Sequence, residues 1–137
     1  MSTGADGKSE ASSNALILRV LLAQTVLTAV LAAVILSIDG PVSGYSALLG
    51  GLTAVVPNAF LALRLAAPRR TPRALALVRA AWIGELGKLT LTAVMFGAIF
   101  IAVRPLAAGA VFAGFVVAEL GIFAGFLRSE RARRGIG

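Results

Sequence analysis

Two ionisable side chains stand close together in a stretch of this chain that is otherwise apolar. Glu85 and Lys88 belong to the segment Gly84-Glu85-Leu86-Gly87-Lys88, within a run long enough to cross a membrane. A charged side chain near the bilayer centre costs at least roughly 2.5–3.5 kcal/mol on insertion scales, so it is seldom kept without a use. Because they are three residues apart, the two groups share a helical face and can partly neutralise each other. The pair predicts a polar contact inside a membrane.

The composition indicates the medium in which these charges must lie. The chain has 137 residues, of which 58% are hydrophobic and 14% are charged, and its mean hydropathy is +0.92. Soluble domains contain about 25% charged residues, and a soluble chain of this length could not bury so much apolar surface. We therefore expect an all-α integral membrane protein, a four-helix bundle with one domain.

The residue types exclude several kinds of chemistry. The chain contains no cysteine and no histidine, so it has no thiol nucleophile, imidazole base, disulfide or Cys/His zinc site. We expect no enzymatic activity, no cofactor and no metal centre. The net charge of +7 comes from arginines that flank apolar spans, which favours membrane topology and anionic lipids over nucleic acid as its explanation.

Uncharged runs separated by turn and charge signals predict four spans. They lie near residues 15–38, 43–64, 79–103 and 105–127, and together form a transmembrane domain over residues 15–128. Asp39-Gly40-Pro41 is a turn signal between the first two spans, and Arg104-Pro105 separates the last two. Residues 1–14 are predicted to be a flexible polar tail, and residues 129–137 a basic tail.

The distribution of arginine orients the spans. Basic residues concentrate in the second connector and the C-terminal tail, which hold Arg64, Arg69, Arg70, Arg73, Arg79, Arg128, Arg131, Arg133 and Arg134. The first connector has no basic residue and the third has one. The positive-inside rule then places both termini in the cytoplasm, and the arginines face a lipid surface that carries anionic headgroups.

Depth counting along the oriented spans, at about 1.5 Å per residue, predicts a polar layer. Gln24, Asn58, Glu85, Lys88 and Glu119 all fall in the cytoplasmic half. We predict that Lys88 pairs with Glu119, because their depths match. If all three charged groups are ionised the layer sums to −1, so one carboxylate needs protonation or another cation. The layer could lock the helix register, contact a partner or, against the effect of the nearby ammonium, hold a hard cation.

The second span carries two further signals. Pro57 removes a backbone hydrogen bond and predicts a kink there. Ser43, Ala47 and Gly51 recur at every fourth residue, which permits close helix packing either within the bundle or against another protein.

These motifs resemble a known family. Residues 44–51 (GYSALLGG), the Val-Pro-Asn at 56–58 and the segment 84–88 are similar to elements of the bacterial ATP synthase protein I family. The resemblance implies a four-span protein of the bacterial plasma (inner) membrane, associated with the F-type ATP synthase. The family is regarded as an assembly factor for the ring of c subunits, although some members are proposed to pass magnesium or calcium ions.

The resemblance also suggests which residues meet a partner. The motif positions are Gly50, Gly51, Pro57, Asn58, Glu85 and Lys88, and Glu119 is added from the polar layer of this chain. We expect these residues to contact c subunits transiently, with other F0 subunits as further candidate partners. The alternative is a small cation channel or transporter associated with the synthase.

Overall fold

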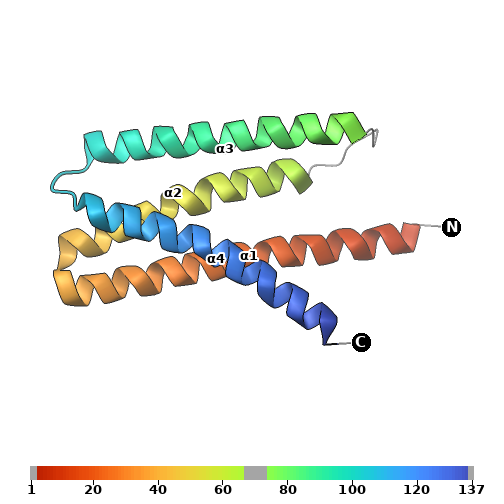
Figure 1. The fold of residues 1–137 in the computed structure, drawn as a ribbon, viewed down its shortest axis with the longest axis horizontal. Helices are drawn as coiled ribbons and strands as arrows, with labels where there is room; N and C mark the ends of the chain where they lie inside the picture. The colour runs from red at the N-terminus through yellow and green to blue at the C-terminus, as the bar shows by residue number, and fades with distance from the viewer. Residues whose placement is uncertain (1–2, 67–73, 136–137) are drawn as a thin grey trace.

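The computed structural model describes residues 3–66 and 74–135, and these residues form four helices (Figure 1). The helices are α1 (Thr3–Asp39), α2 (Pro41–Ala66), α3 (Ala74–Ala102) and α4 (Ala108–Arg134). Each contains a segment that is long and apolar enough to cross a membrane. The prediction of an all-helical chain with four candidate spans is confirmed.

The helices extend beyond the predicted spans. α1 begins at Thr3 and so includes most of the segment predicted to be a tail, while α4 continues to Arg134. Alanine, glutamate, lysine and arginine in these extensions are good helix formers, so the hydrogen-bond ladder continues past the apolar residues. α3 begins earlier than predicted, at Ala74, and α4 begins later, at Ala108. The arginines predicted in the second connector at 69, 70 and 73 lie outside the described residues.

The turn between α1 and α2 forms where the sequence predicts it. Gly40 adopts a φ of 91°, in the left-handed region that favours glycine. Its N–H donates to the Leu36 carbonyl at 3.2 Å, which closes the end of α1. Pro41 then opens α2, where its missing N–H and fixed φ suit the first helical turn. This short connection makes α1 and α2 antiparallel neighbours.

α2 is the central helix, since it packs against α1, α3 and α4. α4 also packs on α1, and Figure 1 shows it crossing α1 and α2 obliquely. α3 lies at the edge of the molecule beside α2 (Figure 1). It reaches α4 by side chains: Phe96 stacks on Phe112 and meets Phe115 edge-on, with ring centroids 5.4 and 5.2 Å apart. The bundle is therefore three closely packed helices with α3 attached to one side.

Small and polar residues form the inner face of α2. The buried residues of this helix are Ser43, Gly44, Ser46, Ala47, Gly50, Gly51, Thr53, Ala54, Pro57 and Asn58. A methyl group on Gly50 would overlap the backbone carbonyl of Val111 on α4, and one on Gly51 would overlap Thr28 on α1. The small residues thus serve packing within the bundle, because they let the helix backbones approach closely. α2 runs through Pro57 as one helix, and the predicted kink stays a prediction.

Candidate functional site

Asn58, Lys88 and Glu119, which we call the polar cluster, come together from three helices. The Lys88 Nζ lies 3.7 Å from the Glu119 Oε1, which confirms the pairing predicted from depth. The Asn58 Nδ2 donates to the same oxygen at 3.2 Å. The Lys88 and Glu119 side chains are only 16% and 25% exposed. α3 is therefore tied to α4 across the central helix by a charge pair that is largely screened from solvent.

The helical positions explain why Lys88 reaches this cluster. Gly84 is buried against Leu61 of α2, and Lys88 follows Gly84 by one helical turn, so both lie on the face packed against α2. Glu119 follows Ala118, which is fully buried in the core. The glycine allows α3 to come close to α2, and the lysine stem spans the remaining distance to α4. Close packing and ion pairing thus depend on the same face of α3.

Glu85 does not join the polar cluster. It is exposed on α3 and makes no hydrogen bond or ion pair with any residue that the structure describes. At 3.6 residues per turn it is rotated about 100° from Gly84, away from the face that packs on α2. Opposite charges on Lys88 and Glu119 would cancel inside the bundle, which leaves Glu85 as the carboxylate outside the pair.

α1 contributes two buried polar side chains next to the cluster. The Gln24 Nε2 donates to the Ala118 carbonyl at 2.9 Å, one residue before Glu119. Its Oε1 is buried without a partner among the described residues, and so is the Thr28 Oγ1. A buried polar atom without a partner is expensive at membrane depth. The polarity of Gln24 was visible in the sequence, but its backbone partner on α4 depends on the helix crossing.

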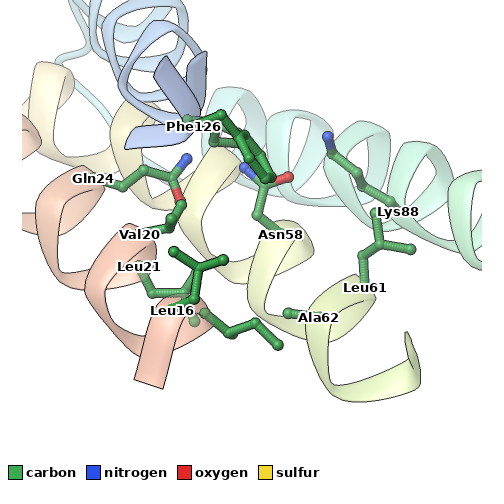
Figure 2. A pocket seen from close by; sticks show the side chains of 11 residues that line it. Leu16, Val20, Leu21, Gln24, Asn58, Leu61, Ala62, Lys88 and Phe126 are labelled. Carbon is green, nitrogen blue, oxygen red and sulfur yellow. The ribbon is translucent and has the colours of Figure 1, made fainter. Parts of the chain in front are cut away.

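A cavity of about 300 Å³ lies beside these groups and is shown in Figure 2. Its walls come from all four helices and are mostly apolar, with Leu16, Leu61 and Phe126 among them. Gln24, Asn58 and Lys88 supply its polar lining. The cavity is thus an apolar pocket with a few convergent polar groups, the general character of a small-ligand or side-chain binding site.

The predicted site residues occupy three different surroundings. Asn58, Lys88 and Glu119 meet in the polar cluster, Gly50, Gly51 and Pro57 are buried in contacts within the bundle, and Glu85 faces outward. The described residues contain no group of three acidic side chains that could hold a metal ion. The arrangement suits helix contacts in a membrane: the polar cluster makes its contacts inside the bundle, and Glu85 is exposed on the outside.

Comparison with known proteins gives the family. Residues 19–116 match the model of the ATP synthase I chain family. The chain is 42% identical to an ATP synthase protein I of Pseudomonas putida over 116 residues, covering 84% of this chain and 86% of that protein. It is 41% identical to the ATP synthase protein I of Pseudomonas aeruginosa over 99 residues, covering 72% and 79%. No solved structure gives a significant match. With its four candidate membrane spans and a family match over most of its length, the chain belongs to the ATP synthase I chain family, whose members are associated with ATP synthase.

Proposed function

We propose that this protein assists assembly of the rotor ring of the F-type ATP synthase by transient contacts with c-subunit helices in the membrane. The observation that carries the proposal is Glu85, an exposed carboxylate on the outer face of α3 that pairs with no residue the structure describes. Such a group is costly in an apolar span, so a partner helix with a hydrogen-bond donor would stabilise it. Family membership supports the synthase as the source of that partner.

The position of α3 at the edge of the fold supports its outer side as the contact surface for a c-subunit helix. α3 packs on α2 along one side, and its opposite side presents Trp82, Leu86 and Leu89, which are 66%, 57% and 57% exposed. This side combines an apolar strip with one carboxylate. A c subunit is a helical hairpin, so one of its helices could lie along that strip while Glu85 provides a polar anchor. The polar cluster then has the separate role of holding α3 on the bundle.

We further propose that the protein lies in the bacterial plasma membrane with both termini in the cytoplasm. The positive-inside rule supports this orientation, since Arg64, Arg79 and Arg128 lie at the same end of the bundle as both termini. Because the chain has no cysteine, single cysteines can report the topology. In intact cells a membrane-impermeant maleimide should label Ser37→Cys at the opposite end of α1 and leave Ser129→Cys unlabelled. The reverse pattern would invert the orientation.

The assembly role is tested in cells that lack the protein. We expect deletion to lower the yield of detergent-resistant c-rings, wild-type protein to restore it, and Glu85→Gln to restore it only in part. Glu130→Gln is the matched control, because Glu130 is exposed but already pairs with Arg134 at the far end of α4. An unchanged ring yield after deletion would overturn the proposal.

Crosslinking tests the surface independently of yield. A photoreactive residue at Leu89 on the outer side of α3 should capture the c subunit, whereas one at Leu36 on α1 should not. Purified protein in liposomes should show no magnesium or calcium flux. Flux that disappears in the Glu85→Gln variant, with no crosslink to the c subunit, would instead favour the cation-channel alternative.

A further inference from the structure

A groove between α1 and α4 lies apart from the polar cluster and from the outer face of α3. Its volume is about 450 Å³, and its polar lining comes from Arg19 on α1 with Arg128 and Ser129 on α4. A second hollow of about 300 Å³ shares Arg19 and Ser129 and adds Ser13. The two hollows adjoin at these shared residues, and we call them together the α1–α4 groove.

The two arginines of the groove have no counter-ion among the residues that the structure describes. Neither Arg19 nor Arg128 forms an ion pair with any residue that the structure describes. The nearest carboxylate along α4, Glu130, pairs instead with Arg134 at 3.8 Å. Two guanidinium groups on opposite walls of one groove repel each other unless an anion lies between them. Guanidinium groups match the oxygens of a phosphate and bind them by paired, charge-assisted hydrogen bonds.

The remaining lining shows what kind of anion fits. Towards the centre of the bundle the walls become apolar, through Val20, Ala23 and Gly125. Ala23 lies about 6 Å deeper than Arg19, and Gly125 about 4.5 Å deeper than Arg128, at 1.5 Å per helical residue. Gly125 leaves this part open, since a methyl group there would lie 3.3 Å from the Val20 Cγ2. The groove is charged on the side of the two termini and apolar further in, as a phospholipid is within one leaflet.

We propose that the α1–α4 groove binds one anionic phospholipid, with its phosphate between Arg19 and Arg128 and an acyl chain along Val20, Ala23 and Gly125. The Ser129 hydroxyl, on the same wall as Arg128, is a further donor for the headgroup. A free phosphate ion would leave the apolar part of the groove unfilled. An acidic protein segment would pair with the guanidinium groups but would place polar groups against the apolar walls. The lipid would join α1 and α4 near the ends of their spans, on the side of the two termini. This inference does not depend on the c-ring proposal.

Native mass spectrometry of the purified full chain tests the site. We expect one phosphatidylglycerol to be retained at least roughly tenfold more strongly than phosphatidylcholine, and Arg19→Gln/Arg128→Gln to remove this preference. Arg64→Gln/Arg79→Gln is the matched control, because it removes the same charge from the same end of the bundle and should keep the preference. Equal loss in both variants, no preference in the wild type, or displacement of the lipid by millimolar inorganic phosphate would overturn the proposal.

A second measurement uses the unaltered protein and so does not depend on whether the variants fold. Phosphatidylglycerol with a photoreactive group in its acyl chain should label peptides that contain Val20–Ala23 of α1 and the region around Gly125 of α4. Phosphatidylcholine with the same group should label them weakly. Labelling concentrated on α3, or equal labelling by the two lipids, would overturn the assignment to this groove.

Discussion

Replacing Lys88 with methionine tests whether the polar cluster holds α3 on the bundle. Methionine matches the lysine stem as far as Cε and lacks the ammonium, so Glu119 loses the charge 3.7 Å from its Oε1 and keeps the Asn58 amide at 3.2 Å. α3 has few other attachments: it packs along α2, its Phe96 ring contacts two rings of α4, and its buried residues are Gly84 and Ile99. The change should therefore reduce the stability of the whole bundle.

The magnitude follows from the distance and the exposure. Two unit charges 4 Å apart attract by about 4 kcal/mol at an effective dielectric constant of 20. Removing one member of a fully buried pair costs about 3–5 kcal/mol, mostly because the other charge is left unpaired. Since Glu119 keeps a quarter of its side-chain exposure, we expect Lys88→Met to lower the free energy of unfolding by about 1–3 kcal/mol. Glu119→Gln should cost a similar amount, and the double variant less than the sum.

The assay is unfolding of the purified protein by increasing SDS in mild detergent, followed by circular dichroism and by the fluorescence of the single Trp82 on α3. The double-mutant cycle should give a coupling of at least about 1 kcal/mol between Lys88 and Glu119. Glu85→Gln is the control, because this exposed carboxylate has no partner in the described structure, and it should change stability by less than about 0.5 kcal/mol. A coupling of zero would show that Lys88 and Glu119 do not stabilise each other.

Three further predictions use the same unfolding measurement. Gly50→Ala should destabilise by about 3 kcal/mol, because its new methyl group would overlap a backbone carbonyl of α4. Gly97→Ala, with nothing within 4 Å, should instead be neutral or stabilise by up to about 1 kcal/mol; equal effects would contradict the packing. Ser46→Ala should destabilise by about 1–2 kcal/mol, because the Ser46 hydroxyl accepts a hydrogen bond from the Ala107 N–H of the α3–α4 connector at 3.0 Å. Ser37→Ala loses only a hydrogen bond to its own helix and should destabilise by less than about 0.5 kcal/mol. Gln24→Leu should stay within about 1 kcal/mol of wild type, since it removes both a hydrogen bond and an unpaired buried oxygen; a loss above about 2 kcal/mol would show that the oxygen has a partner.

Much of the architecture could be predicted from the sequence alone. Uncharged runs of about 20 residues require membrane helices, since backbone polar groups in lipid must be satisfied within the segment. The Asp39-Gly40-Pro41 turn was predictable because glycine favours the left-handed conformation found there. The Lys88–Glu119 pair followed from equal depth, because antiparallel spans with known ends bring residues at one level close together. Span length, turn chemistry and depth are all local or additive properties.

The different positions of the Glu85 and Lys88 side chains depend on the tertiary structure. Three residues apart, the two groups looked like partners on one face, yet Lys88 faces α2 with Gly84 while Glu85 faces outward. Periodicity gives the angle between two side chains on a helix, but not the rotation of that helix against its neighbours. That rotation was decided by where Gly84 meets Leu61 of α2. Lys88 and Glu85 therefore belong to different surfaces, the lysine inside the bundle and the carboxylate on its outer face.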